Sequence, residues 1–381
     1  MKLRLDRAAF SDTVAWAARA LPHRPVLPAL AGVVLTASGR TLTAAAFDHE
    51  VSASFVAEAE VVEPGSALVP GRLLSDLSRA LPDRPVELVS DAADTVLSCG
   101  DSQFTLPRIP AEDYPRLPDP PPVLGTVDAA ALAAAVAQVA VAAARDDSLP
   151  VLTAVRVEIT AERLRLAATD RYRLAVRDLP WQPADPRTPG ALAVVPARSL
   201  HDVTRALARA PRGDDRVTIA LRSGPPGTGG LIGFSAGARR ATARLLDAAF
   251  PNYERLFPAA YTGTATVERL PLLEAAKRIA LVADGRSPLR ITLSTGRITL
   301  DAGSGGDARG SETLPGAFRG EPVCIPVSPA YLVEGVGAIA APVVELGYTT
   351  PTKPAVLTGR SEDGTEHDPG YRYLFMPLRS A

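Results

Sequence analysis

Hydrophobic and charged residues alternate along TDRYRLAVRDLPW, the stretch of residues 169–181. Tyr172, Leu174 and Val176 occupy every second position, and charged residues stand between and beside them. A period of two predicts a strand with one packed face and one face in solvent. Asp170 and the threonine before it can bond the backbone through their side chains, which predicts a short bend at the start. Three arginines close to an exposed tyrosine are more than such a strand needs, which indicates a role beyond packing.

The same succession of patterns occurs three times along the chain: a helix, strands, a second helix and further strands. The first helices are expected at Asp6 to Ala20, Asp128 to Arg145 and Pro271 to Val282. The segment RPVLPALAGVVLTASGRTLTAAAFDHEVSASF matches DSLPVLTAVRVEITAERLRLAATDRYRLAV, with Asp48 opposite Asp170, and SPLRITLSTGRITLDAGSGG is a third copy. The chain is therefore expected to hold three versions of one unit.

The second helix of each unit follows a proline. LVPGRLLSDLSRALPDRPVELVS and VVPARSLHDVTRALARAPRGDDRVTIAL align at Pro70 and Pro196, and CIPVSPAYLVEGVGAIAAPVVELGY is a weaker copy at Pro326. Proline near the start of a helix and a turn near its end are the expected boundaries. Two helices and many short strands per unit predict an α+β fold, with helices packed on one side of antiparallel sheets.

Proline-rich segments separate the units. PRLPDPPPVLGT and FPAAYTGTATV have the composition of linkers between domains. We therefore expect three domains, residues 1–124, 125–262 and 263–381, and the length of 381 residues also favours two or three domains over a single core.

Composition narrows the class of protein. The chain is 46% hydrophobic and 22% charged, as in soluble globular proteins. It has no long uncharged apolar run, and its N-terminus MKLRLDRAAF carries charge where an export signal needs an apolar core, so we expect a cytoplasmic protein with no membrane span. Cys99 and Cys324 are the two cysteines, which argues against a disulfide framework or a cysteine metal site and favours thiols packed as small hydrophobes.

Catalytic signatures are weak. GPPGTGGL resembles the start of a phosphate-binding loop, but Gly230 replaces the lysine, Leu231 replaces the serine or threonine, and a strand follows instead of a helix. A nucleotide-binding enzyme is therefore a minor alternative, and a hairpin loop is favoured. The four histidines, His23, His49, His201 and His367, lack metal-ligand spacing. We expect no catalytic residues, no metal and no cofactor.

Several motifs together carry a family resemblance: RPVLP, VPGRLLSDLSRALP, ATDRYRLAV, FPNYERLFP and YLFMPLR. Over essentially the whole chain the sequence resembles the bacterial β sliding clamps, the DNA polymerase III β subunits, and in particular the actinobacterial ones. The resemblance implies three clamp domains per chain and a head-to-tail homodimeric ring with helices lining the hole. It further implies a non-catalytic processivity factor that encircles double-stranded DNA and tethers the replicative polymerase α subunit, the clamp loader and other replication and repair proteins.

A sliding ring needs attraction to phosphate that does not depend on base sequence. The formal net charge is −1, so that attraction must come from a local basic surface. Basic residues recur on the corresponding helices, and the resemblance adds one in each of two loops, Arg24 and Arg145. The second helix of the last unit offers Glu334 and no basic residue, which leaves its contact with DNA open. The expected DNA-facing set is Arg24, Arg72, Arg79, Arg145, Arg198, Arg205, Arg209, Lys277 and Arg278.

The resemblance also implies what the opening strand faces, a hydrophobic pocket for short peptides between the second and third domains. Apolar side chains there suit leucine and phenylalanine anchors, arginines hold carbonyls and acidic groups, and methionine adapts to several partners. The expected pocket residues are Leu152, Thr169, Arg171, Tyr172, Arg173, Leu174, Pro251, Arg255, Leu256, Ser328, Tyr331, Thr352, Pro354, Leu374, Phe375, Met376, Pro377, Leu378 and Arg379.

Two roles remain open for such a clamp. Natural products, including cyclic peptide antibiotics, occupy this pocket in the family, and some organisms carry a second, less sensitive clamp. The sequence fits either the housekeeping clamp or such a replacement. It also leaves open how the bulky Arg171-Tyr172 pair and the Ser380-Ala381 tail affect the pocket.

Overall fold

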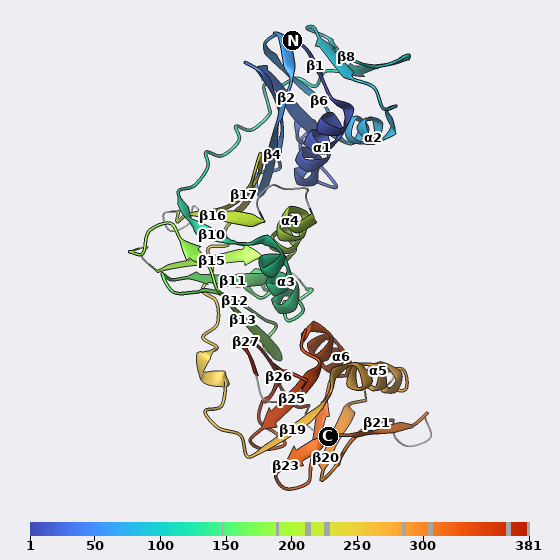
Figure 1. Ribbon diagram of the computed structural model, residues 1–381, viewed down its shortest axis with the longest axis vertical. Helices are drawn as coiled ribbons and strands as arrows, with labels where there is room; N and C mark the ends of the chain where they lie inside the picture. Colours follow the sequence, from blue (N-terminus) through green and yellow to red (C-terminus); the bar gives the residue numbers. More distant parts are fainter. Residues whose placement is uncertain are drawn as a thin grey trace. The chain divides into compact units, whose positions relative to one another are not determined.

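Figure 1 shows the computed structural model of the chain. The structure describes residues 1–146, 148–187, 190–209, 215–224, 229–283, 287–303, 308–362 and 367–378. Within these residues the α-helices number six, two for each expected unit: α1 Arg7–Ala17, α2 Gly71–Ala80, α3 Ala129–Ala140, α4 Ala197–Arg209, α5 Arg269–Ala280 and α6 Pro329–Ala338. The predicted α+β class, with helices on antiparallel sheets, is confirmed.

Contacts within the chain divide it into two compact units. The first unit comprises Met1–Ala130, Gln182–Pro186 and Asp202–Asp247, and the second comprises Ala131–Trp181, Arg187–His201 and Ala248–Ala381. The two units divide the predicted central domain between them, and the predicted domain boundaries remain a prediction.

Two antiparallel sheets form the first unit. Over the described residues the smaller sheet has the order β5-β1-β7-β8-β9, and the larger has the order β14-β10-β16-β17-β18-β4-β3-β2-β6. The smaller sheet consists of β1 Lys2–Leu5, β5 Glu60–Glu63, β7 Val86–Ser90, β8 Asp94–Cys99 and β9 Ser102–Pro107. The larger consists of β2 Gly32–Ser38, β3 Thr41–Phe47, β4 Val51–Glu58, β6 Gly65–Pro70, β10 Val123–Asp128, β14 Gln182–Pro183, β16 Arg216–Arg222, β17 Leu231–Ala236 and β18 Arg239–Arg244. Because β4 pairs with β18, the first and second repeats share one sheet.

Helix α1 follows from its sequence. The Asp6 side chain accepts a hydrogen bond from the Ala9 backbone N–H at 3.0 Å and so caps the helix. Phe10, Val14 and Ala17 recur at helical spacing and are buried. They face the sheet at β3 and β4, against which α1 packs, and α2 lies beside α1.

The second unit repeats this plan. Over the described residues its larger sheet has the order β15-β11-β12-β13-β27-β26-β25-β19-β23, and its smaller sheet has the order β22-β21-β20-β24. The larger sheet consists of β11 Ala154–Ile159, β12 Leu164–Thr169, β13 Arg173–Leu179, β15 Ala191–Pro196, β19 Gly263–Glu268, β23 Ala317–Arg319, β25 Val343–Tyr348, β26 Ala355–Arg360 and β27 His367–Phe375. The smaller consists of β20 Leu289–Ser294, β21 Arg297–Ala302, β22 Gly310–Pro315 and β24 Val323–Val327.

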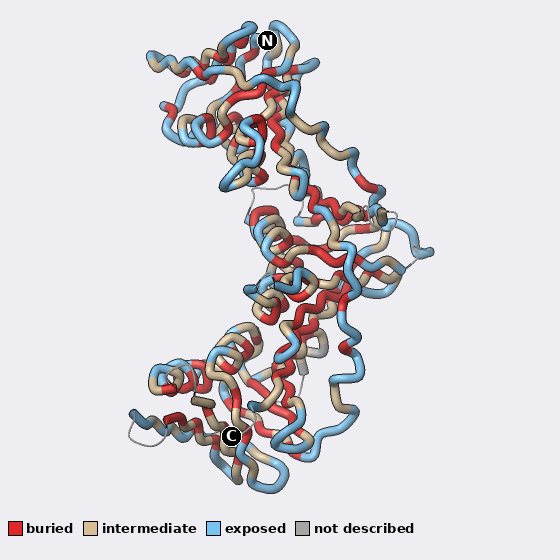
Figure 2. The backbone as a smooth tube through the Cα atoms, turned by 180° about the vertical axis from the view of Figure 1, so that it is seen from behind, coloured by how far each residue is buried: buried red, intermediate tan, exposed pale blue. Residues whose placement is uncertain are grey.

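The pairing of β13 with β27 joins the second and third repeats in one sheet. On β27 the hydroxyl of Tyr371 donates to the Gln138 carbonyl of α3 at 3.2 Å, and that of Tyr373 donates to the Tyr331 carbonyl of α6 at 2.9 Å. Both tyrosines are buried, so the strand is fixed to helices of two repeats. The buried residues follow the sheets and the helix faces that cover them (Figure 2).

Three sequence expectations need correction. The strand of residues 169–181 begins only at Arg173, and Arg173 to Val176 are all buried, so both faces of this part of β13 are covered. β13 is an interior strand of its sheet, between β12 and β27. The expected helix from Asp128 ends at Ala140. Cys99 is buried as expected, but Cys324 is exposed, because it lies on the edge strand β24.

Membrane spans, metal sites and a phosphate-binding loop can be assessed over the described residues. None of the helices there is long and apolar enough to cross a membrane, and no cluster of potential metal ligands occurs among those side chains. The GPPGTGGL segment connects the antiparallel strands β16 and β17, as expected of a hairpin, although its residues 225–228 lie outside the described part of the chain. The side chain of His367 lies outside it too.

Candidate functional site

A tight turn precedes β13. The Asp170 carboxylate accepts hydrogen bonds from the backbone N–H groups of Tyr172 and Arg173, both at 3.0 Å. The Thr169 hydroxyl donates to the Arg173 carbonyl at 2.6 Å and accepts from the Arg171 N–H at 3.1 Å. Arg171 has φ 79°, in the left-handed region that side chains rarely adopt. The bend predicted at Thr169-Asp170 is confirmed, and it leaves Arg171 and Tyr172 exposed, Tyr172 by 57%.

The end of the chain lies against this turn. The Met376 N–H donates to the Tyr172 carbonyl at 2.7 Å, and the Leu378 N–H donates to the Pro326 carbonyl of β24 at 2.8 Å. Met376 and Pro377 are half-buried, and Leu378 is 38% exposed. The structure thus brings together the turn and the tail, two of the segments that the sequence predicts to line one pocket.

Buried residues support this junction from the sheet. Leu174 of β13 lies opposite Leu374 of β27, and Phe375 lies opposite Arg173 and, on the other side, Ala355 of β26. Leu174, Leu374 and Phe375 are buried, which makes them packing residues.

Arg173 is held inside the protein. Its side chain is 5% exposed, forms an ion pair with Asp170 at 3.0 Å, donates to Glu334 of α6, and lies 4.5 Å from the ring centroid of Tyr331. Burial alone would lower the pKa of Arg173, but Tyr373 and Glu334 outweigh it and raise the pKa above its ordinary value. Arg173 is therefore a charged packing residue, and Arg171 is the arginine of this turn that solvent reaches.

Glu334 has a second partner. Its other carboxylate oxygen accepts from Arg145 at 2.6 Å, and the Arg145 side chain is 85% exposed. The acidic residue on α6 therefore joins the loop after α3 to the turn before β13. The sequence identified Glu334 only as a departure from the basic pattern, because its partners are distant in sequence.

Other predicted pocket residues lie on neighbouring elements. Leu152 is buried in a 3-10 turn, η3 Pro150–Thr153, and its carbonyl accepts from the Ala144 N–H at 2.8 Å. Ser328 immediately precedes α6, and Thr352 and Pro354 lie in the connection between β25 and β26. Arg379 lies outside the described residues.

The segment after β18 crosses the large sheet of the second unit. The Tyr253 hydroxyl donates to the Glu158 carboxylate of β11 at 2.8 Å, and Arg372 of β27 lies 4.3 Å from the ring centroid of Phe257. Burial, followed by the bond to Glu158, raises the pKa of Tyr253 well above its ordinary value. The predicted pocket residues Pro251, Arg255 and Leu256 are exposed along this segment, and the described contacts do not join them to the turn.

All nine predicted DNA-facing residues are exposed. Several hold acidic partners nearby: Arg79 pairs with Asp76 at 2.8 Å, Lys277 with Glu274 at 2.8 Å, and Arg278 with the half-buried Glu312 at 2.5 Å. Exposed ion pairs contribute only about 0–1 kcal/mol, so a phosphate could replace these partners at little cost.

The sequence missed one basic residue near this set, Arg19. Burial lowers the pKa of Arg19; Asp202 opposes this, and Arg205 and Arg209 lower it further. These interactions indicate a basic cluster of Arg19, Arg205 and Arg209 in the first unit. The helical pattern does not reveal it, because Arg19 follows α1 in sequence and the other two lie on α4.

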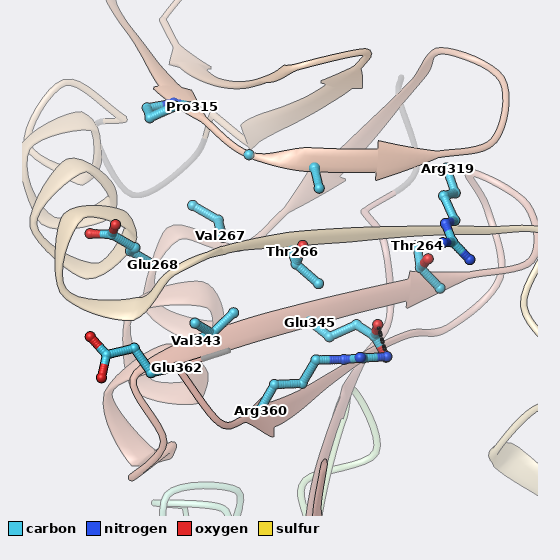
Figure 3. A pocket seen from close by; sticks show the side chains of 12 residues that line it. Thr264, Thr266, Val267, Glu268, Pro315, Arg319, Val343, Glu345, Arg360 and Glu362 are labelled. Carbon is cyan, nitrogen blue, oxygen red and sulfur yellow. Dashed lines mark ion pairs between the residues drawn. The ribbon is translucent and has the colours of Figure 1, made fainter. Parts of the chain in front are cut away.

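A hollow of about 560 Å³ that the sequence did not predict lies on β19, β23, β25 and β26. Figure 3 shows Arg360 reaching toward Glu345, and the two form an ion pair at 2.6 Å. Thr264, Thr266 and Glu268 recur at every second position of β19 along it. Its described lining contains no histidine, cysteine or serine.

Comparison with known proteins matches the whole chain. Models of the DNA polymerase III β subunit match as N-terminal domain over residues 1–118, central domain over 126–252 and C-terminal domain over 254–378. The chain is 47% identical to the β sliding clamp of Streptomyces coelicolor, covering 100% of this chain and 99% of that one, and 42% identical to that of Micrococcus luteus, covering 83% and 99%. It is 39% identical to the β sliding clamp homolog GriR of Streptomyces muensis, covering 100% and 99%.

Solved structures of β sliding clamps have the same fold as this chain. The DNA polymerase III β subunit of Pseudomonas aeruginosa has a TM-score of 0.89 at 26% identity, with full coverage of both chains. The same species' clamp bound to griselimycin gives the same TM-score, identity and coverage. The chain therefore belongs to the DNA polymerase III β subunit family, the β sliding clamps, and is a non-catalytic processivity subunit of that polymerase.

Proposed function

We propose that the exposed turn and the chain end form a docking pocket through which the clamp holds replication proteins on DNA. The observation that carries this proposal is the hydrogen bond from Met376 to Tyr172, which joins the exposed Arg171-Tyr172 pair to the tail. Leu256, 47% exposed, and Leu378 add apolar surface in the same unit. Leucine or phenylalanine anchors of a peptide would contact this surface, and Arg171 and Arg255 would pair with its carbonyls and acidic groups.

The proposed occupants are short peptides of the replicative polymerase α subunit, the clamp loader and other replication and repair proteins. Cyclic peptide antibiotics are proposed for the same pocket, and the griselimycin complex of the Pseudomonas aeruginosa clamp supports binding of natural products by this family. Identity is higher with the Streptomyces coelicolor clamp, at 47%, than with GriR, at 39%. We therefore favour the replicative role over that of a less sensitive replacement.

We also propose that two copies close head to tail around duplex DNA. Over the described residues, β9 is an edge strand of the smaller sheet in the first unit, and β22 is an edge strand of the smaller sheet in the second unit. Edge strands present unpaired backbone groups and pair readily with another strand. Beside β22, the end of α5 exposes 84% of Leu281, apolar surface that a second chain would cover. A heterologous contact of this kind repeats until a ring closes. The proposed DNA partner implies a cytoplasmic location.

Deletion of the tail from Met376 onward tests the pocket. A peptide of the Gln-x-x-Leu-Phe type should bind the full chain in calorimetry and lose all measurable affinity for the deletion. Single changes of Met376 or Leu378 to alanine should each cost roughly 1–3 kcal/mol, the range for interface anchors. Light scattering should find the deleted chain still dimeric. Unchanged peptide affinity after the deletion would overturn the proposal.

A further inference from the structure

A hollow of about 210 Å³ lies in the first unit, and its described lining includes none of the predicted peptide-binding or DNA-facing residues. The strands that surround it are the ends of β3, β16 and β18 and the start of β17, together with the linker that precedes β10. We name it the junction groove. The side chains that define it are Phe47, His49, Pro118, Arg222, Leu231 and Arg244.

The turn at this groove is the repeat equivalent of the turn at the peptide pocket. The Asp48 carboxylate accepts from the N–H groups of Glu50 at 3.0 Å and Val51 at 2.6 Å, as Asp170 does in its own turn. His49 has φ 77°, against 79° for the arginine at the matching position. No other described residues except glycines have positive φ. The same unusual backbone is therefore built twice, at corresponding points of two repeats.

The strand that ends beside each turn is also equivalent. The Arg244 N–H donates to the Glu50 carbonyl at 2.8 Å, as the Met376 N–H donates to the Tyr172 carbonyl at 2.7 Å. Arg244 thus occupies the position that Met376 holds at the peptide pocket. The backbone frame is shared, whereas a soft apolar side chain has been replaced by a guanidinium.

The described lining of the junction groove combines apolar and basic side chains. The rings of Phe47 and His49 are 5.6 Å apart, and Leu231 and Pro118 add apolar surface. The Phe47 backbone N–H donates to the Tyr114 hydroxyl at 2.9 Å, and this bond holds the end of β3 in place. Burial raises the pKa of Tyr114 to about 12.

Charge complementarity indicates what the groove would accept. Arg222 and Arg244 are both exposed, and the described lining includes no carboxylate side chain. Arg222 donates from Nη2 to the Asp119 carbonyl at 3.2 Å, which leaves other N–H groups of its fork facing solvent. Two guanidinium groups beside an apolar hollow suit carboxylates that flank one hydrophobic side chain. The volume is below the roughly 300–1,000 Å³ of small-molecule sites, so it suits a single anchor and not a cofactor.

We propose that the junction groove is a second peptide-docking site, which takes acidic segments with one leucine or phenylalanine anchor. The anchor enters between Phe47, Leu231 and Pro118, and flanking carboxylates pair with Arg222 and Arg244. Each chain then offers two docking points of different preference, a methionine-lined one at the tail and an arginine-lined one at the preceding junction. The two turns share their backbone geometry whatever the tail pocket binds. The proposed second site therefore does not depend on the ligand of the tail pocket.

A fluorescein-labelled peptide with a single anchor, Ser-Asp-Phe-Asp-Ser-Asp-Ser, tests the proposal by fluorescence anisotropy with the full chain. Arg222→Ala and Arg244→Ala should each weaken binding about tenfold, the loss expected for one charge-assisted contact. The version of the probe with asparagine for every aspartate should lose affinity by at least that factor. A benzophenone in place of the probe's phenylalanine should cross-link to tryptic peptides that contain Phe47 or Leu231.

Two variants serve as controls. Arg240→Ala removes an exposed arginine from the same strand, β18, outside the groove, and Leu378→Ala alters the tail pocket. Both should leave the affinity for the probe unchanged. Equal weakening by Arg240→Ala would show general charge attraction, and weakening by Leu378→Ala alone would assign the probe to the tail pocket. Either result, or no binding at about 1 mM probe, would overturn the second site. The tail pocket is judged separately by the Gln-x-x-Leu-Phe peptide, so failure of one site is distinguishable from failure of the other.

Discussion

Replacing Glu334 with glutamine tests whether its carboxylate holds Arg173, the buried arginine that follows the turn at residues 169–172. Glu334 accepts from Arg173, which is 5% exposed, and from Arg145, which is 85% exposed. Glutamine keeps the size of the side chain but removes its charge. Arg173 would retain its ion pair with Asp170 at 3.0 Å. The variant therefore weakens the network without leaving Arg173 wholly unpaired.

The expected loss lies between two limits. Removing one partner of a fully buried pair costs roughly 3–5 kcal/mol, because the other charge stays buried and unpaired. Here Glu334 is 25% exposed and Asp170 remains, so we expect roughly 1.5–3 kcal/mol, the range for a lost hydrogen bond to a charged group. Arg145→Ala removes only the exposed pair and should cost about 0–1 kcal/mol.

The measurement is urea unfolding followed by the fluorescence of Trp181, which is buried in the second unit and donates to the Thr160 carbonyl at 2.9 Å. Trp16 is replaced by phenylalanine in every variant, so that the first unit does not contribute. Glu334→Gln should lower the unfolding midpoint clearly more than Arg145→Ala does. It should also weaken binding of the Gln-x-x-Leu-Phe peptide, because Arg173 lies against Tyr331.

Equal midpoints for the two variants would refute this reasoning. They would mean that the Glu334 carboxylate contributes no more through the buried arginine than through the exposed one. Asp170 alone would then be sufficient to hold Arg173.

Three further outcomes are expected. Burial raises the pKa of Asp178, but Arg165, bonded to it at 2.5 and 2.8 Å, outweighs this and holds the pKa below 3.8. The Asp178 carboxylate therefore binds a proton more weakly in the folded state than in the unfolded state. Its stabilisation of the fold is complete above about pH 4 and is lost as pH falls below that value. Asp178→Asn should remove this contribution to acid unfolding, as followed by circular dichroism. Leu281→Asp should raise the dimer dissociation constant at least about tenfold in sedimentation, because a charge enters a surface that the ring would bury, and an unchanged constant would argue against that interface. The ring should stay on closed circular DNA and slip off linear DNA in gel filtration without preference for base sequence, and equal retention on both would contradict encirclement.

Local patterns were sufficient to predict the elements. Helical spacing located all six helices, because apolar residues such as Phe10, Val14 and Ala17 recur on the face that packs. The Thr169-Asp170 bend was also readable, because its bonds link residues within four positions of one another. Internal repetition then indicated three repeats, and three domain models of the family match the chain.

Pairings between distant residues could not be read in this way. Nothing near Arg173 indicates that β27 pairs beside it or that Glu334 and Tyr331 of α6 lie against its side chain, and these contacts make Arg173 a packing residue. Its partner Glu334 is 161 positions away, and alternation reports the exposure of a strand only if its neighbours are known. The candidate pocket was therefore predicted as a set of segments, without the division between exposed Arg171 and buried Arg173.

The pairing of β13 with β27 also determines how the chain bears load. If the polymerase binds at the proposed pocket, its pull acts on Met376, directly beyond the end of β27. Force applied along a strand loads its flanking backbone hydrogen bonds in shear, so rows of bonds to β13 and β26 must break together before the strand slides. The proposed docking point is thus attached to the sheet in the direction that resists extraction best, and tension is shared by two repeats. A tether for a moving enzyme benefits from this arrangement, because a strong pull should release the peptide before it unravels the clamp.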